Sequence, residues 1–165
     1  MKKAFSLIEL LIVILIIGII YTLSIGNFKK IKDAGEVKLS LKNLKEYLQN
    51  IEHQHSVEIL CVDECASCDI FVDAEKFTSK SIENFLDKSV KVYRYDFNLG
   101  MVEKEFKNGV CFSFDVDKKG VSSQYIVEYD SKVYDYTTYL DDTKVYNSLQ
   151  EVSEVKENLA QEILR

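Results

Sequence analysis

A long apolar run near the start of the chain limits what this protein can fold into. Between residues 5 and 26 the only charged side chain is that of Glu9. As an α-helix these ~22 residues would measure about 33 Å, enough to cross the hydrocarbon core of a bilayer. A carboxylate at mid-bilayer costs about 2.5–3.5 kcal/mol, so it is seldom kept without a partner or a task. The run therefore predicts a membrane-spanning helix in which Glu9 has a specific role.

A cut in the chain before Phe5 would supply a partner for this carboxylate. Phe5 and Glu9 are four residues apart, so in a helix they lie on one face, one turn apart. The α-amino group created on Phe5 would place a positive charge on that face. The acid inside the apolar run then gains a cation.

The chain begins MKKAFSLIE and continues with the apolar run. Over about residues 1–26 it resembles the prepilin signature of type IV pilins and of the pseudopilins of type II secretion. The resemblance implies that a prepilin peptidase cuts between Ala4 and Phe5 and then N-methylates Phe5. It also implies that Glu9 meets the N-terminal amine of a neighbouring subunit during filament assembly. The family usually has Gly before the cut, where this chain has Ala4.

Ordinary export signals fit the N-terminus less well. A secretory signal has an apolar core of about 7–15 residues and a small-x-small cleavage site, whereas this run is longer and no such site follows it. A lipoprotein signal needs a cysteine soon after the run, and the first cysteine is Cys61. A plain uncleaved membrane anchor is the alternative left open, although it gives no reason for Glu9.

Length and charge set the outer limits of the remaining chain. The 165 residues allow one membrane segment and one domain of about 110 residues. The net charge of −6 argues against nucleic acid as a partner, because phosphate binding needs a basic surface. Lysines flank both ends of the apolar run, so the positive-inside rule does not decide its orientation. The resemblance and the cysteines favour a cytoplasmic leader and an exported C-terminal domain.

Helical periodicity continues beyond Gly26. Apolar residues recur at spacings of three and four, with a charged stripe of Lys38, Lys42 and Lys45 beside them. The apolar positions are Phe28, Ile31, Val37, Leu41, Leu44, Leu48 and Ile51. The pattern predicts one long helix from residue 5 to about residue 52, whose amphipathic second half packs on a small sheet. A coiled-coil dimer is the alternative, but the seam spans only two to three heptads.

Four cysteines follow the predicted helix: Cys61, Cys65, Cys68 and Cys111. The C-x₃-C-x₂-C spacing of the first three also occurs in radical-SAM enzymes, which need a reducing compartment and a much larger barrel. A Cys₄ zinc site is a second alternative, although structural zinc usually has two paired knuckles. Two disulfides suit a small exported domain best. Three pairings are possible, and in each one Cys111 pairs with a member of the cluster.

Two other patterns resemble metal sites. His53 and His55 can ligate a metal, but two imidazoles at a polar helix end are more often solvated. Residues 115–120 resemble a calcium loop, but Lys119 stands at a ligand position and Ile126 replaces the closing Glu. This stretch therefore predicts a turn, and neither a metal nor a cofactor is predicted.

From residue 69 onward the pattern predicts short antiparallel strands. They are residues 70–72, 90–97, 101–107, 110–117, 124–129 and 132–140. Asn108 and Gly109 predict a tight hairpin between the third and fourth of these strands. Within residues 110–117, alternation places Cys111 on the face away from the core. The tyrosines of this region are either ordinary sheet filling or an exposed contact surface.

Two helices are predicted after the N-terminal one. Residues 81–86 form a short helix with Ser81 as N-cap. Residues 148–164 open with a capping box, Ser148 to Glu151, and continue with apolar residues at helical spacing. This C-terminal amphipathic helix is mainly acidic, so it and the basic N-terminal helix attract each other within or between subunits in our hypothesis.

The predicted fold is therefore α+β: a long N-terminal helix packed on a small antiparallel β-sheet, with a C-terminal amphipathic helix. The chain divides into a leader, a transmembrane half-helix, an amphipathic half-helix, a cysteine-containing β-rich domain and a C-terminal helix. Their ranges are residues 1–4, 5–26, 27–55, 56–147 and 148–165.

No catalytic constellation is found in the sequence, so an enzyme is not predicted. The resemblance implies a pilin-like subunit, placed in the bacterial inner membrane with a periplasmic C-terminal domain. It then polymerises into a type IV pilus or a type II secretion pseudopilus. Its implied partners are the prepilin peptidase, like or related pilin subunits, a membrane assembly platform and the lipid bilayer. The alternative is a membrane-tethered exported binding module, such as a minor or tip subunit, that does not form the shaft.

Overall fold

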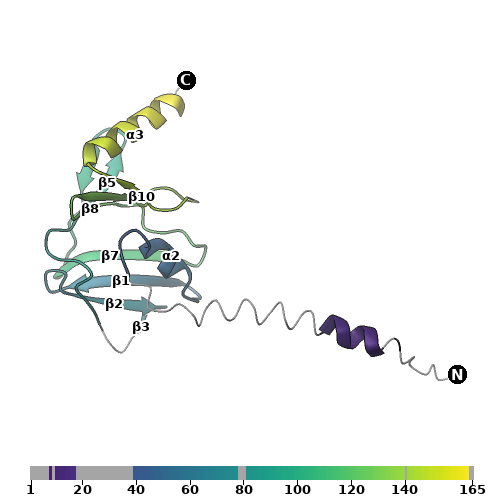
Figure 1. The fold of residues 1–165 in the computed structure, drawn as a ribbon. Coiled ribbons are helices and arrows are strands. Elements are labelled where there is room, and N and C mark those ends of the chain that lie inside the picture. Colours follow the sequence, from purple (N-terminus) through teal and green to yellow (C-terminus); the bar gives the residue numbers. More distant parts are fainter. Residues whose placement is uncertain (1–7, 9, 18–38, 78–80, 140, 164–165) are drawn as a thin grey trace. The chain divides into compact units, whose positions relative to one another are not determined.

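The computed structural model describes residues 8, 10–17, 39–77, 81–139 and 141–163 (Figure 1). The chain divides into two compact units, Met1–Lys38 and Leu39–Arg165. In the first unit, residues 10–17 are helical, as the apolar run predicts. The described residues of the second unit form two antiparallel sheets and two helices, α2 (Leu44–Gln49) and α3 (Leu149–Ile163).

The predicted long N-terminal helix is seen only in part. Residues 18–38, the middle of the predicted helix, lie outside the described residues. Residues 39–43 are not helical, and α2 ends at Gln49, three residues before the predicted end. Ser40 gives a local reason for the break, because its backbone N–H and its hydroxyl both donate to Oδ1 of Asn43, at 2.8 and 3.0 Å. These bonds close a separate turn immediately before α2.

The first sheet carries the main core of the globular unit. Its strands are β1 (Ser56–Val62), β2 (Ser67–Val72), β3 (Glu75–Lys76), β4 (Ile82–Glu83) and β7 (Val110–Asp117). They run in the order β3-β2-β1-β7, with β4 also paired to β2. Alternate residues of β1 and β7, such as Ile59 and Phe114, are fully buried. Leu44 and Leu48 of α2 are also fully buried and pack in the same cluster.

The second sheet lies between the first sheet and α3 (Figure 1). Its strands are β5 (Lys91–Asp96), β6 (Gly100–Glu103), β8 (Ile126–Tyr129), β9 (Lys132–Asp135) and β10 (Lys144–Tyr146), in the order β10-β9-β8-β5-β6. Val92 and Val127 on one face join the main core. Ile126 and Val133 on the other face pack with Val152 of α3. The expected single small sheet is thus two sheets.

The predicted hairpin at Asn108 and Gly109 is wrong. Both residues have positive φ angles, 59° and 75°, so the tight turn itself is present. The strands on either side do not pair, because β6 pairs with β5 and β7 pairs with β1. A turn sequence reverses the chain locally, but burial of an apolar face decides which strand becomes the neighbour.

Other predicted elements match the structure to different degrees. The helix expected at residues 81–86 is wrong, because this stretch contains β4 and because Asn84 has a φ angle of 58°, outside the helical region. The strand expected at residues 110–117 is confirmed as β7. The C-terminal helix is confirmed as α3, and the hydroxyl of Ser148 accepts the N–H of Glu151 at 3.2 Å. The strands β1, β3 and β10 were not predicted.

Candidate functional site

The residues predicted to direct processing and assembly, Ala4, Phe5 and Glu9, lie outside the described residues. The neighbouring residues 10–17 form an apolar helical stretch whose side chains are about half exposed, from 48% for Val13 to 62% for Ile14. An apolar surface on all sides of a helix calls for a lipid or protein environment. Among the helices of the described residues, none reaches the length and apolarity needed to cross a bilayer.

The four cysteines form two disulfides, Cys61–Cys68 and Cys65–Cys111. Cys61 and Cys68 face each other directly on β1 and β2. Cys65 lies in the turn between these strands and is joined to β7 through Cys111. The turn is therefore fixed both to its own hairpin and to the neighbouring strand. A disulfide sulfur is no thiolate ligand, so this pairing and a zinc site at the same cysteines exclude each other.

The turn between β1 and β2 has an unfavourable backbone conformation. Asp63, Glu64 and Cys65 have φ angles of 54°, 54° and 68°, in the left-handed region. This conformation costs a residue other than glycine roughly 1–2 kcal/mol of conformational free energy. The Cys65 side chain is fully buried, so the Cys65–Cys111 disulfide anchors the strained turn to the body of the unit.

Lys45 is buried, which corrects its predicted place in a charged stripe. Its side chain is on the core side of α2, and the residue is only 6% exposed. Nζ donates to the carbonyl oxygens of Thr138 at 2.7 Å, Tyr139 at 3.4 Å and Asp141 at 2.9 Å. An ammonium group has three N–H donors, so these three carbonyls satisfy it completely.

The carbonyls that surround Lys45 belong to a segment that we call the strap, residues 136–139 and 141–143. It connects β9 with β10 and is held against α2. Tyr136, at its start, is fully buried, and its hydroxyl donates to the carbonyl oxygen of Leu41. Burial raises the pKa of Tyr136 well above its ordinary value, so this hydroxyl stays a donor. Lys45 and Tyr136 together fix the start of the globular unit.

The two histidines have different surroundings. Both ring nitrogens of His53 face carbonyl oxygens, Nδ1 that of Ile51 at 2.7 Å and Nε2 that of Asp117 at 3.1 Å. Two acceptors favour the doubly protonated imidazolium and raise the pKa of His53. The side chain of His55 is 76% exposed, and its Nδ1 lies 3.7 Å from Oδ1 of Asp73. Within the described ranges, His, Cys, Asp and Glu form no cluster suited to a metal ion.

A buried ion pair joins α3 to the second sheet. Nζ of Lys156 lies 2.7 Å from Oδ2 of Asp135, and their side chains are 13% and 1% exposed. The hydroxyl and backbone N–H of Thr137 donate to Oδ1 of Asp135, at 2.7 and 2.9 Å. Lys156 of α3 and Thr137 of the strap therefore both contact the Asp135 carboxylate.

Most tyrosines of the globular unit fill space between its layers. Tyr129 and Tyr134 are packed against the main core, whereas Tyr93, Tyr95 and Tyr146 are packed beneath α3. Burial, and then the negative charge of Glu128, raise the pKa of Tyr93 to about 12. Tyr139 differs, because it projects from the strap and is 63% exposed.

The sequence did not predict that three residues, Lys45, Tyr136 and Asp135, hold elements of the globular unit together. For Lys45 a signal was present, because it follows Leu41 by four residues and so lies within the apolar pattern of the helix. Asp135 and Tyr136 carried no comparable signal. Their partners, Lys156 and Leu41, are distant in the sequence.

Comparison with known proteins gives one match, at the N-terminus. Residues 1–22 match the family model described as the prokaryotic N-terminal methylation motif. No curated protein and no solved structure gives a significant match. The matched residues include the predicted cleavage position and Glu9, so the expected resemblance is confirmed. The chain carries the prokaryotic N-terminal methylation motif that is characteristic of type IV pilins and pseudopilins.

Proposed function

We propose that this protein is a pilin-like subunit that assembles into a type IV pilus or a type II secretion pseudopilus. The match of residues 1–22 to the methylation motif carries the proposal. In it, the apolar N-terminus inserts into the bacterial inner membrane, and a prepilin peptidase cuts between Ala4 and Phe5 and methylates Phe5. The unit from residue 39 onward faces the periplasm, where disulfides persist.

Glu9 has the assembly role in this proposal. A carboxylate in the hydrocarbon layer is unfavourable alone, and the Phe5 amine of a neighbouring subunit would neutralise it. Two opposite charges in a medium of low dielectric attract each other strongly, so the pair would fix the register between subunits. Platform proteins of the membrane and like or related subunits are the partners that this step requires.

The globular unit supports a structural role. Its buried charged groups, Lys45, Asp135 and Lys156, are all engaged in contacts that hold α2, the strap and α3 in place. The two disulfides connect three strands of the first sheet and the turn between two of them. These features make a crosslinked body suited to exposure outside the cytoplasm.

Intact mass of the membrane-extracted protein tests the processing. We expect a mass that lacks residues 1–4 and contains one additional methyl group. Reduction should add four hydrogens, two for each disulfide. A full-length, unmethylated mass with free thiols would leave only a plain membrane anchor.

Replacement of Glu9 tests the assembly role and separates the two candidate functions. Glu9→Gln removes the charge with little change in size, and we expect processed protein that no longer forms sedimentable filaments. Glu9→Asp keeps the charge and should retain part of the assembly. If Glu9→Gln leaves partner binding and location unchanged and the wild type forms no filament, the protein is a tethered exported module instead.

A further inference from the structure

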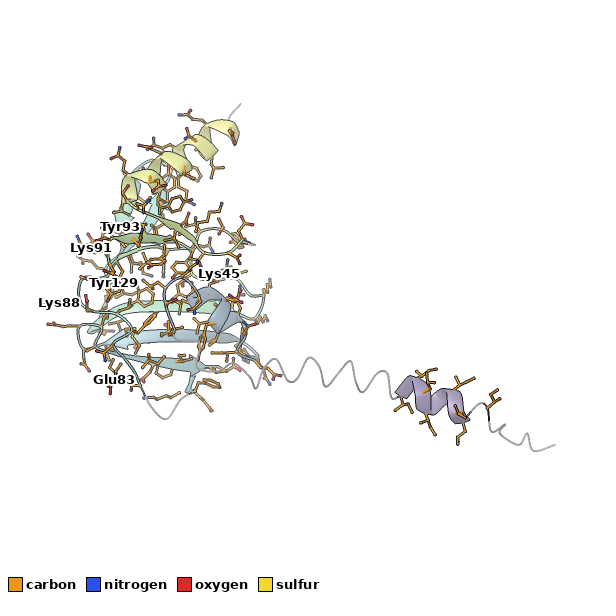
Figure 2. All side chains as sticks on the ribbon, viewed as in Figure 1. Lys45, Glu83, Lys88, Lys91, Tyr93 and Tyr129 are labelled. Carbon is orange, nitrogen blue, oxygen red and sulfur yellow. A yellow bond between two sulfur atoms is a disulfide. The ribbon has the colours of Figure 1, made fainter. Side chains whose placement is uncertain are left out.

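The turn at Asn108–Gly109 joins two strands that do not pair with each other. Strand β6 ends at Glu103, and β7 begins at Val110. The partner of β6 is β5 in the second sheet, whereas the partner of β7 is β1 in the first sheet. Figure 2 shows Tyr93 of β5 in the upper sheet and Glu83 of β4 in the lower one. The turn therefore lies between two sheets and outside the strand pairs of both.

A single backbone hydrogen bond closes this turn, from the N–H of Val110 to the carbonyl oxygen of Lys107 at 3.2 Å. Lys107, Asn108 and Gly109 are all exposed. Among the described residues, no heavy atom beyond its chain neighbours lies within 4 Å of the position that a Cβ on Gly109 would occupy. In a paired hairpin the strands on both sides hold such a turn closed. Here the turn can open locally without breaking a strand pair.

Asn108 is the only asparagine in the sequence that is followed by glycine. This pair of residues can react with water alone. The backbone nitrogen of Gly109 gives its proton to a base in the solvent and attacks Cγ of Asn108, which releases the side-chain nitrogen as ammonia. Glycine allows this close approach because it has no Cβ to shield its nitrogen.

The product of the attack is a five-membered succinimide ring, which one water molecule then opens. Opening at Cγ of Asn108 gives aspartate. Opening at the main-chain carbonyl of Asn108 gives isoaspartate, in which the peptide bond to Gly109 runs through Cγ. In sum, one water is consumed and one ammonia is released, so neither an oxidant nor a reductant is needed.

Two other exposed asparagines lie in less favourable surroundings. Asn98 belongs to the β5–β6 hairpin, whose two strands pair with each other. The backbone N–H of the next residue, Leu99, also donates to Oδ1 of Asp96 at 3.1 Å. The side-chain oxygen of Asn147 accepts from Nζ of Lys132 at 2.8 Å. Each of these contacts holds one of the two groups that must meet for the reaction.

We propose that Asn108 is a site of spontaneous chemical modification, at which the folded protein converts to aspartate and isoaspartate without an enzyme. Either product adds a negative charge to the exposed turn, and isoaspartate also adds one atom to the main chain. The strand pairs do not involve the turn, so modified copies keep both sheets. The modified fraction therefore increases with the age of each copy. This inference goes beyond the proposed function, since a filament subunit and a tethered module would react alike.

Incubation of the folded, full-length protein in ¹⁸O-enriched water tests the site. The protein is then digested at acidic pH in ordinary water, so that only conversion during the incubation carries ¹⁸O. Peptide mass spectrometry should find labelled aspartate and isoaspartate at Asn108, formed roughly tenfold faster than at Asn98 and Asn147. The rate should rise from pH 7 to pH 9, because the attacking nitrogen must lose its proton. Equal rates at the three sites, or no labelled product at Asn108, would overturn the proposal.

Three variants test the chemistry and its structural basis separately. Gly109→Ala places a Cβ beside the attacking nitrogen and should slow the conversion several-fold. Because the φ angle of 75° at this position is unfavourable for alanine, Asn108→Gln is the second variant. Its longer side chain would need a larger ring, so the conversion should be lost, and a persisting conversion in both variants would contradict the mechanism.

Leu99→Gly is the matched structural control, because it creates a second Asn-Gly pair in a hairpin whose strands do pair with each other. We expect Asn98 to convert faster in this variant than in the wild type, but still several-fold more slowly than Asn108 of the same molecule. Equal rates at the two Asn-Gly pairs would show that the sequence alone sets the rate. That result would overturn the inference that the position between two sheets makes Asn108 reactive.

Discussion

Lys45 is buried, and its ammonium group links α2 to the strap. In the described part of the chain its partners are three backbone carbonyls of the strap and no carboxylate. Moving an ammonium group out of water is unfavourable, so its hydrogen bonds must offset that cost. The side chain thereby holds together two segments that are separated by more than ninety residues in the sequence.

We expect Lys45→Met to lower the free energy of unfolding by about 2–3 kcal/mol, because three buried carbonyls lose their donor. Lys42→Met is the matched control, because Lys42 is exposed in the turn just before α2. It should change the free energy of unfolding by less than about 0.5 kcal/mol. Urea unfolding followed by tyrosine fluorescence measures both, since the chain has ten Tyr and no Trp. A more stable Lys45→Met protein would show that desolvation of the ammonium outweighs its hydrogen bonds.

His53 should make stability depend on pH. The carbonyls of Ile51 and Asp117 raise the pKa of His53 in the folded state. A raised pKa contributes stability that is fully present below the unfolded value of about 6.5 and is lost as pH rises through the folded value. The charged groups that face the ring, Asp73 and Asp117, act in the same direction.

Urea midpoints measured from pH 5 to pH 9 test this dependence. We expect the wild type to lose stability as the pH rises from about 6.5 through the folded pKa of His53, and His53→Gln to remove this loss. His55→Gln should keep it, because that side chain is mostly exposed. An unchanged pH profile in His53→Gln would assign the dependence to another group.

At the scale of elements, α3 is fixed to the sheet by packing of Val152 and by the pair of Lys156 with Asp135. The strap depends on the same carboxylate, because Thr137 donates to it twice. Helix α3 and the strap therefore share one buried acid, Asp135. Loss of either partner should disturb both elements.

We expect Lys156→Met to destabilise the protein by about 3 kcal/mol, because it leaves the Asp135 carboxylate buried without its cation. The double variant Asp135→Asn/Lys156→Met should lose less than the sum of the two single changes. Lys144→Met is the control: its contact with Asp141 is exposed and 4.0 Å long, so the effect should be near zero. If the free-energy losses of the two single variants add up to that of the double variant, the two side chains act independently.

At the scale of the whole molecule, the globular unit has two core clusters that share the second sheet, and two disulfides crosslink its first sheet. One cluster lies between the first sheet, α2 and the second sheet, and the other lies beneath α3. A domain of this size buries a limited apolar area, so crosslinks add a substantial share of its stability. The longer disulfide, Cys65–Cys111, spans 46 residues, and the shorter spans 7.

Chain entropy predicts different effects for the two disulfides. Removing Cys65–Cys111 by paired Cys→Ala changes should cost about 4 kcal/mol, and removing Cys61–Cys68 about 2.5 kcal/mol. The longer loop loses more entropy on closure, and its disulfide also anchors the strained turn. Urea unfolding of the two double variants, each with the other disulfide intact, measures the difference. A larger loss of stability on removal of Cys61–Cys68 would mean that this disulfide acts mainly through contacts in the folded state.

The elements with strong local signals could be predicted from the sequence. The strand at residues 110–117 followed from strict alternation, and the C-terminal helix from a capping box and helical spacing. The methylation motif was equally local, because a peptidase recognises a short linear stretch. Where a local signal was weak, as at residues 81–86, the neighbouring strand β2 decided the conformation.

The sequence by itself therefore determined the N-terminal motif, the α+β class and the elements with strong periodicity, since each depends on residues close together in the chain. Only the tertiary structure decided that Asn108 and Gly109 join strands of two different sheets, and that Cys65 pairs with Cys111. It also buried the Lys45 side chain of α2 against the carbonyls of the strap. The physical reason is the same in each case: strand pairing, disulfide pairing and burial of a charge depend on partners brought together from distant parts of the chain, and many such combinations satisfy the same local pattern.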